Sequence, residues 1–470
     1  MIERLNTLFV TIVCVLVLPA VALAQFPSPT YGWNLGNTLE PPCGEGCWAP
    51  AATQAMINEV ADAGFNTIRI PVAWNSHASQ TAPYTIDASW LNRVKQVVDW
   101  SLDANLTVMI NSHWDGGWFE SNIGDTVNPT INAKMNSYWT QIANNFAGYD
   151  ERLLFAAANE PNIRDDELDN VAQMSTLMSY YQTFVNAVRG TGGSNTSRWL
   201  VVQGPITDID LTDSLMNTLP SDPTEDRLAV EVHYYDPFQF TLMLNDEWWG
   251  NQFYFWGDDY NSATLPTRNA THSEEDHLVA QLQKMHTKFV SQGVPVILGE
   301  FSATNRTGNP ELTGDDLDLH LASRLYYHQL IVDTANSLGI SPFYWDNGWT
   351  GLNGSGIFNR DNATVFDQDT VDALTAAAAP AGDYNQNGVV DAADYTVWRD
   401  TFGSTTDLRA NGNGDSQIDA GDYAVWKTNF GDSATGGSIA MVTATVPEPS
   451  KGIIILLCCC SFAVFRHTSR

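Results

Sequence analysis

The sequence predicts an α/β protein whose main part is a (β/α)8 barrel, the TIM-barrel fold, followed by a small α-helical module. Between about residues 30 and 378, short apolar runs alternate with longer stretches in which apolar residues recur every three or four positions. The first pattern indicates strands buried in a parallel sheet, and the second indicates amphipathic helices. Polar residues also follow most of the apolar runs, as they do at the functional rim of such barrels.

Eight candidate strands are each followed by a helix or a long loop, which favours a closed barrel. The strands are expected at Tyr31–Asn34, Thr67–Pro71, Leu106–Ile110, Leu153–Ala158, Trp199–Val202, Leu228–Val232, Val294–Leu298 and Pro342–Trp345. The helices are expected at Thr53–Ala63, Trp90–Ala104, Ile131–Phe146, Leu168–Val188, Glu274–Ser291 and Leu317–Leu338. Gly64 follows the first of these helices and is a typical residue for a helix end.

Seven of the eight strand ends carry polar or aromatic side chains suited to a shared site. They are Trp33 with Asn34, Arg69, His113 with Trp114 and Asp115, Asn159 with Glu160, His233 with Tyr235, Glu300, and Trp345 with Asp346. Because Glu160 and Glu300 both follow apolar strands, we expect them to face each other across one cleft. Two such carboxyl groups are what a glycosidase requires.

Structural interpretations stay open for each of these residues. Glu160 precedes Pro161 and could be an N-cap carboxylate, and Glu300 could belong to a structural ion pair. Arg69 could pair with another carboxylate. The two histidines and Trp345 could be ordinary core residues.

Six motifs in this order resemble the successive signatures of glycoside hydrolase family 5, the retaining (β/α)8 cellulases and their relatives. The motifs are Gly32–Asn37, Ile68–Pro71, Asn111–His113, Asn159–Pro161, His233–Tyr235 and Gly299–Phe301, and the resemblance covers roughly residues 28–378. It implies a retaining endo-β-1,4-glucanase that needs no cofactor for catalysis. A related enzyme acting on mannan, xyloglucan or mixed-linkage glucan is the close alternative. A non-catalytic glycan-binding surface protein is the alternative of another class, but it would need neither glutamate.

The resemblance assigns a role to each motif residue. Glu160 becomes the general acid/base and Glu300 the nucleophile. The supporting residues are Arg69, His113, Asn159, His233, Tyr235 and Trp345. Many family members have a second His where this chain has Trp114, so the shape of the sugar subsites is expected to differ here.

The residues themselves suggest how the site would work. The charge of Arg69 favours ionised Glu300, and the Tyr235 hydroxyl can donate a hydrogen bond to that carboxylate. Repulsion from Glu300 keeps Glu160 protonated until an ester forms. Asn159 can bond the sugar 2-hydroxyl, the histidines orient these groups, and Trp345 forms the floor of the subsite.

The loop Asp236–Tyr260 is rich in aromatic residues, with Trp248-Trp249 and Phe253–Trp256. We expect it to form one wall of the substrate groove, although core packing beneath a long loop is an alternative. Trp114 and Trp118 allow the same two interpretations.

The amino-acid composition indicates which kinds of molecule the protein can bind. The chain has 22 Lys and Arg against 54 Asp and Glu, a formal net charge of -32, so no basic surface is available for nucleic acid. Its 16 tryptophans suit the stacking of sugar rings. An uncharged β-glucan polymer is therefore the expected substrate, and the catalytic domain is expected to act as a monomer.

The N-terminus has the pattern of an export signal. Residues 1–24 combine Arg4, an apolar run from Leu8 to Leu18 and a small-residue cleavage site, so a mature chain starting at Gln25 is expected to be secreted or bound to the cell surface. Export permits disulfides. Cys43 and Cys47 are expected to form one, because two thiols without a nearby His cannot complete a zinc site.

Beyond the catalytic domain, expected over residues 25–378, lies a repeat within residues 379–432. Asp383–Gly403 and Asn411–Gly431 are identical at nine of 21 positions. Oxygen-bearing residues follow EF-hand spacing in both copies and resemble a dockerin, which implies bound Ca²⁺ and a cohesin-like partner. The expected ligands are Asp383, Asn385, Asn387, Asp391, Asp394, Asn411, Asn413, Asp415, Asp419 and Asp422. The second copy departs from the pattern at Asn411 and Ser416, and a solvated linker is the alternative.

The remaining residues, 433–470, form a linker and a tail. Val446–Pro449 precedes the apolar run Ile453–Phe465 and the basic residue Arg466. The order resembles the bacterial Pro-Glu-Pro sorting signal, which is processed on export. A membrane anchor is the alternative, although the run is short for crossing a bilayer.

Overall fold

The computed structural model of the protein describes residues 26, 30–163, 170–375, 382–385, 389–405, 409–412 and 417–431. The chain divides into two compact units between Thr375 and Ala376, next to the predicted linker Ala376–Pro380. The predicted signal peptide and the C-terminal tail lie outside the described residues. No helix in the described part of the chain is long and apolar enough to cross a membrane.

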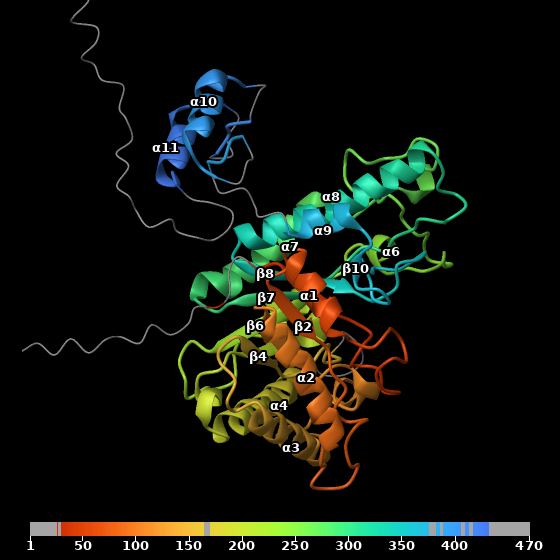
Figure 1. The fold of residues 1–470 in the computed structure, drawn as a ribbon, viewed down its shortest axis with the longest axis vertical. Helices are drawn as coiled ribbons and strands as arrows, with labels where there is room; N and C mark the ends of the chain where they lie inside the picture. Colours follow the sequence, from red (N-terminus) through yellow and green to blue (C-terminus); the bar gives the residue numbers. More distant parts are fainter. Residues whose placement is uncertain are drawn as a thin grey trace, which may run out of the picture. The chain divides into compact units, whose positions relative to one another are not determined.

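The first unit is a closed barrel of eight parallel strands, so the predicted fold of this unit is confirmed (Figure 1). The strands are β1 Gly32–Leu35, β2 Thr67–Ile70, β3 Thr107–Asn111, β4 Leu153–Ala156, β5 Leu200–Gln203, β6 Leu228–Tyr234, β7 Val296–Phe301 and β8 Ile340–Asp346. They pair in chain order, and β1 closes the barrel on β8 with Gly32 opposite Phe343.

Helices cover the outside of the barrel, and α3 and α4 lie side by side in Figure 1. Their bounds are α1 Gln54–Asp62, α2 Ala88–Asp103, α3 Pro129–Asn145, α4 Asn170–Gly190, α5 Ile209–Leu215, α6 Phe238–Thr241, α7 Glu275–Lys288, α8 Asp315–Ser337 and α9 Gln368–Thr375. Local sequence explains several starts, because the side chains of Thr53 and Asn128 accept hydrogen bonds from the first turns of α1 and α3. A short antiparallel pair, β9 Phe358–Asn359 and β10 Thr364–Val365, follows β8.

The predicted elements differ from the observed ones mainly at their ends and in short pieces. The short helices α5 and α6, and α9 after the last strand, were not predicted. Strand β7 continues through Glu300 to Phe301, so Glu300 stands within the strand and not after it. Residues 161–163, directly after Glu160, are not helical, so Glu160 is not a helix N-cap.

An apolar layer fills the amino-terminal half of the barrel. It consists of Met109, Leu154, Ala156, Trp199, Val201, Ala229, Ile297 and Phe343. On β6, Ala229, Glu231 and His233 alternate, and alternate residues of a strand face the same side. The barrel interior therefore changes from apolar to charged toward the carboxyl ends of the strands.

In its described residues, the second unit contains two short helices, α10 Ala392–Thr401 and α11 Ala420–Thr428, which follow equivalent positions of the repeat. Its core consists of Tyr384, Val390, Ala410, Ile418 and Trp426. The two halves exchange hydrogen bonds, because the Trp398 indole donates to the Asp419 carbonyl and the Trp426 indole to the Asp391 carbonyl, both at 2.8 Å.

Candidate active site

The residues predicted for the site come together at the carboxyl ends of the barrel strands. Most of them border a cavity of about 350 Å³. Its lining residues are Asn37, Glu40, Trp48, His113, Trp114, Glu120, Asn159, Glu160, Tyr235, Leu242, Glu300 and Trp345. A second cavity of about 420 Å³ shares Glu160, Tyr235 and Leu242 with the first, so the hollow continues past Glu160.

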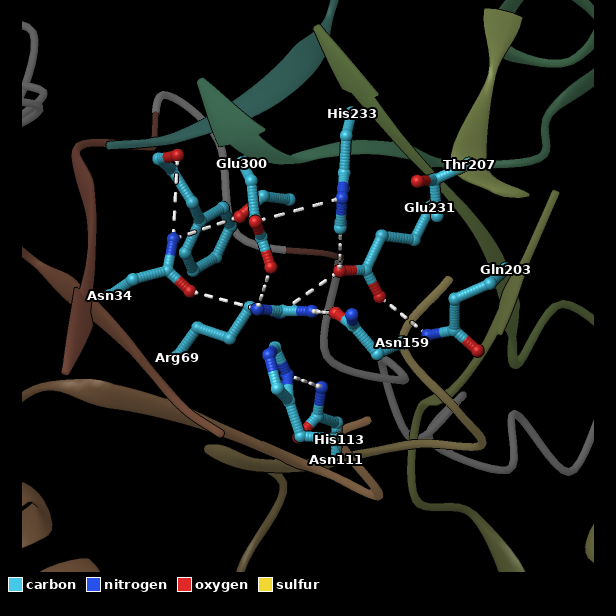
Figure 2. Close-up of polar contacts among 12 residues, drawn as sticks. Asn34, Arg69, Asn111, His113, Asn159, Gln203, Thr207, Glu231, His233 and Glu300 are labelled. Carbon is cyan, nitrogen blue, oxygen red and sulfur yellow. Dashed lines mark hydrogen bonds and ion pairs between the residues drawn. The ribbon is translucent and has the colours of Figure 1, made fainter. Parts of the chain in front are cut away.

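Arg69, at the end of β2, is the centre of the polar contacts (Figure 2). Its side chain is fully buried, and it donates from Nη1 to Glu300 Oε1 at 2.8 Å and to Asn34 Oδ1 at 3.0 Å. Nη2 donates to Asn159 Oδ1 at 2.8 Å, and Nε lies 2.9 Å from Glu231 Oε1. The predicted pairing of Arg69 with Glu300 is thus present, and the same guanidinium also fixes the amide of Asn159.

Glu231 lies beneath the site and holds two cations in place. Its carboxylate contacts Arg69 on one side and His233 Nε2 at 3.2 Å on the other, and it accepts a hydrogen bond from Gln203 Nε2. Burial alone would raise the pKa of Glu231, but the charge of Arg69 and the contacts with His233 and Gln203 together outweigh it and lower the pKa. Glu231 is therefore a carboxylate inside the barrel, and its partners compensate for the lost hydration.

The two candidate carboxyl groups are adjacent. One oxygen of Glu160, one ring nitrogen of His233 and one oxygen of Glu300 all lie within 4.8 Å of one another. His233 Nδ1 is 2.8 Å from Glu160 Oε1 and 3.8 Å from Glu300 Oε2. Carboxyl groups about 5–5.5 Å apart mark a retaining glycosidase, whereas inverting enzymes separate them by about 6.5–9.5 Å.

Burial and neighbouring charges set the protonation states of His233, Tyr235 and Glu300. Burial alone would lower the pKa of His233, but Glu300, Glu160 and Glu231 raise it to about 9. Burial and the charge of Glu300 raise the pKa of Tyr235, so its hydroxyl stays protonated and donates to Glu300 Oε2 at 3.0 Å. Burial also raises the pKa of Glu300, and the charges of His233 and Arg69 oppose that shift.

His113 behaves differently from His233. Burial and the charge of Arg69 lower its pKa well below the ordinary value, so the ring is neutral. Its Nδ1 contacts the Asn111 amide at 3.2 Å. The ring lies parallel to Trp345, with centroids 5.7 Å apart. These contacts fix one edge of the surface on which a sugar ring would lie.

A local irregularity of β7 explains how Glu300 reaches the cleft. The pairing of β7 with β8 shifts between Leu298 and Phe301, and such a bulge redirects the following side chain. Gly299 precedes Glu300, and a Cβ atom there would stand 2.1 Å from Glu231 Oε1. Glycine thus leaves room for the buried carboxylate directly beside Glu300.

All eight residues that the motifs singled out border the cavity or bond to its lining residues, whereas Glu231, Gln203 and Glu120 were not predicted. Glu231 carried a signal, because a charged residue two positions before His233 in an apolar strand must face the same side. Gln203 ends an apolar strand in the same way. Glu120 lies in a loop and has no such pattern.

The aromatic residues of the long loop divide into two groups. Phe253, Tyr254, Phe255 and Trp256 are buried, so the core-packing interpretation holds for them. Trp248 is 94% exposed and Trp249 48%, and Trp249 packs near Phe238, which lines the second cavity. Likewise Trp118 is buried, whereas Trp114 is exposed and lines the first cavity.

A short covalent loop carries another aromatic residue to the cavity. Cys43 and Cys47 form a disulfide, and Trp48 follows directly and lines the cavity. Glu45 anchors the same loop through the ion pair with Arg93 at 2.7 Å. The loop therefore holds Trp48 at the rim.

Comparison with known proteins agrees with this geometry. The family model described as Cellulase (glycosyl hydrolase family 5) matches residues 32–351. Endoglucanase A of Paenibacillus barcinonensis is 36% identical over 365 residues, which are 73% of this chain and 86% of that protein. The xyloglucan-specific endo-beta-1,4-glucanase of Bacteroides ovatus is 37% identical over 68% of this chain and 63% of its own length. Among solved structures, the family 5 xyloglucanase from Paenibacillus pabuli, in complex with ligand, has a TM-score of 0.66 and 35% identity, covering 73% of this chain and 97% of that one.

Because Glu231 belongs to the buried charge network, substituting it tests how much this network contributes to the stability of the fold. Replacing it by Gln leaves Arg69 without one of its carboxylate partners, and breaking a buried pair costs about 3–5 kcal/mol of unfolding free energy. The pKa of His233 should also fall from about 9, because one of the carboxylates that raise it is gone. The imidazolium would then lose its proton, and its share of the stability, at a lower pH than in the unaltered protein.

Denaturant unfolding and NMR titration of the His233 ring measure the two effects. Asp99→Asn, which removes the exposed ion pair with Lys95, is the control and should cost about 1 kcal/mol or less. An unchanged His233 titration in Glu231→Gln would contradict the assigned coupling.

Proposed function

This chain belongs to glycosyl hydrolase family 5, the cellulase family, and on that premise we propose that it is a secreted, retaining endo-β-1,4-glucanase. The observation that carries the proposal is the pair of carboxyl groups, Glu160 and Glu300, whose oxygens lie within 4.8 Å of each other around His233. Catalysis in this family needs no cofactor, so the reaction is assigned to side chains alone.

In the first step Glu300 attacks the anomeric carbon and the bond to the leaving oxygen breaks. Arg69 and Tyr235 each bond one oxygen of Glu300, which orients the carboxylate and favours its charged form. Glu160 gives its proton to the leaving oxygen. The protonated ring of His233 donates a hydrogen bond from Nδ1 to Glu160 Oε1 at 2.8 Å. Asn159, held by Arg69, is placed to bond the sugar 2-hydroxyl.

In the second step the ester between the sugar and Glu300 is hydrolysed. Glu160 takes a proton from water, the water oxygen attacks the anomeric carbon, and Glu300 leaves as a carboxylate. The Glu160 side chain is 38% exposed whereas that of Glu300 is 7% exposed. Glu160 is thus the more accessible of the two carboxyl groups to the water that it must activate. Two inversions at one carbon give net retention.

Xyloglucan is the second candidate substrate, because the relatives from Bacteroides ovatus and Paenibacillus pabuli are named for it. Reducing-sugar release from soluble cellulose, mixed-linkage glucan, mannan and xyloglucan, with sizing of the products, decides between them. Long early products support endo action. Absence of release from every β-glycan would end the proposal.

The roles of the two glutamates can be separated with azide. Glu160→Ala should lose about 10²–10⁴-fold in rate on substrates with a poor leaving group, because protonation of that group is missing. On a substrate with a good leaving group the glycosyl ester with Glu300 still forms, so azide should restore turnover there and give the β-glycosyl azide. Glu300→Ala should give only the α-glycosyl azide, by direct displacement on a substrate with a good leaving group.

NMR of the anomeric proton identifies each product. If Glu160→Ala gave the α-glycosyl azide and Glu300→Ala gave the β-glycosyl azide, the roles of the two glutamates would have to be exchanged. Activity of Glu300→Ala on polymer without azide would exclude Glu300 as the nucleophile.

We further assign the exposed tryptophans of the long loop to binding of the polymer beyond the cleavage point. Trp249 stands beside Phe238, which lines the cavity that continues from Glu160, and Trp248 is almost fully exposed. Trp248→Ala and Trp249→Ala should raise KM for polymer roughly 2- to 10-fold, because one stacking contact is lost. KM for an aryl cellobioside should stay unchanged. Phe402→Ala, an exposed aromatic residue of the second unit, is the matched control.

Export and surface association remain part of the proposal. They rest on the signal pattern of residues 1–24 and the Pro-Glu-Pro tail of residues 446–470. Mass spectrometry of the protein recovered from the producing cells tests export and surface association. A mature N-terminus at Gln25 would support export, and the presence or loss of Ile453–Phe465 would show whether the tail is processed. A cohesin-like partner is proposed on the dockerin resemblance alone.

Calcium binding by the second unit is supported by its buried carboxylates. Asp394 and Asp422, at the twelfth position of each loop, are fully buried, and each accepts two main-chain N–H groups across its own loop. A carboxylate has further lone pairs, so both can also bind a cation. Asn387, Asn413 and Asp415 of the predicted ligand set lie outside the described residues. The described ligands of the first loop are Asp383, Asn385 and Asp391, and those of the second are Asn411 and Asp419.

Removal of Ca²⁺ from the full chain should lower the melting temperature of the second unit by several degrees, because an ion bound only by the folded state stabilises it. Activity on a short aryl glycoside should not change. Calorimetry with EDTA and with added Ca²⁺ measures the shift. Asp394→Asn should abolish it in the first loop, and a shift that persists when both Asp394 and Asp422 are replaced would contradict the ligand assignment.

A further inference from the structure

A third carboxyl group, Glu120, stands in the cavity and has no part in the reaction described above. It belongs to the short helical turn Glu120–Asn122 in the connection between β3 and α3. Only 6% of its surface is exposed, and its side chain lines the same cavity as Glu160 and Glu300. A buried carboxyl group is costly unless hydrogen bonds compensate, so its partners indicate what it does.

Those partners are the main chain that carries Glu160 and the side chain of Asn159, the residue before it. Glu120 Oε1 accepts the N–H of Glu160 at 2.8 Å, and the main-chain oxygen of Glu120 accepts the N–H of Asn162 at 3.1 Å. On the other side, the N–H of Ile206 donates to the oxygen of Pro161 at 2.7 Å. Strand β4 ends at Ala156 and α4 begins at Asn170, so Glu160 lies outside both elements. These contacts fix its main chain instead.

We propose that Glu120 is a positioning residue for the general acid/base: its carboxyl group fixes the turn that carries Glu160 and so aims the Glu160 carboxyl at the glycosidic oxygen. The inference rests on the proposed function, because it assigns Glu120 through Glu160. It does not make Glu120 a proton donor to the substrate.

The ionisation of Glu120 is consistent with this role. Burial raises its pKa to about 8; the N–H of Glu160 opposes the shift, and the charges of Glu160 and Glu300 add to it. The group is therefore neutral below about pH 8 and accepts the N–H of Glu160 through its carbonyl oxygen. A glutamine presents the same carbonyl oxygen at the same reach, whereas aspartate is shorter by one methylene and alanine presents no acceptor.

Leaving-group dependence distinguishes positioning of the acid from general damage to the site. In the full-length protein, kcat/KM is measured on an aryl cellobioside with a good leaving group, dinitrophenolate, and on one with a poor leaving group that needs protonation. Glu120→Ala and Glu120→Asp should lose roughly 10- to 100-fold on the poor leaving group, the loss expected from a small misplacement of a catalytic group. They should keep the unaltered value on dinitrophenyl cellobioside. Glu120→Gln should match the unaltered protein on both.

Asp115→Asn is the matched control. Asp115 is buried in the same connection, and its carboxyl group accepts the N–H groups of Asn75 and Ser76, which lie in the segment after β2 and not in the Glu160 turn. Its effect should be equal on the two substrates. If Glu120→Ala fails to fold, Glu120→Asp and Glu120→Gln give the answer.

Equal losses on both substrates for the Glu120 variants, or no loss on either, would overturn the inference while leaving the proposed function intact. The inference would also be overturned if Glu120→Gln lost as much kcat/KM on the poor leaving group as Glu120→Asp does. A carbonyl oxygen that accepts the N–H of Glu160 would then not be sufficient. Failure of the proposed function looks different, since the unaltered protein would cleave neither substrate.

Discussion

The charge balance around Arg69 is the constraint on which the rest of the site depends. A guanidinium buried inside a barrel cannot lose its proton, so it must have carboxylate partners. Glu231 binds it from below and Glu300 from the side of the cleft, while His233 is held between Glu231 and Glu160. Two buried cations and their carboxylates therefore form one connected unit. Moving any member would leave another buried charge unpaired, which keeps the geometry rigid in the absence of a substrate.

The barrel makes this unit possible by separating it from an apolar half. Below the charged layer, side chains such as Met109, Ile297 and Phe343 fill the interior. Above it, the strand ends open into the cavity. The close packing of Glu231 against Gly299 shows how little space the network leaves, and the shifted pairing of β7 then turns Glu300 toward the cavity. Backbone geometry and electrostatics thus act together on one residue.

The two candidate catalytic carboxyl groups are held by different means, and the difference matches their tasks. Glu300 stands in a strand, is nearly buried and has two hydrogen-bond donors, as suits a group that forms a bond to carbon. Glu160 stands in a turn outside the strands and is partly exposed. In the proposed mechanism it exchanges protons first with a leaving sugar and then with water. Its position depends on loop contacts, among them that of Glu120.

The class of fold could be predicted from the sequence, because eight apolar runs alternating with amphipathic stretches leave few other topologies. Glu160 and Glu300 could be proposed as the catalytic pair, because their motifs are local. The residues that support them are recognisable only in the folded chain. Glu231 lies 162 positions from Arg69 in the chain, and Glu120 lies 40 positions from Glu160. Their importance comes from burial and from contacts between distant segments, which no local pattern records. The same holds for the aromatic loop, where Trp248 and Trp256 lie eight positions apart in the chain and yet one is exposed and the other is buried.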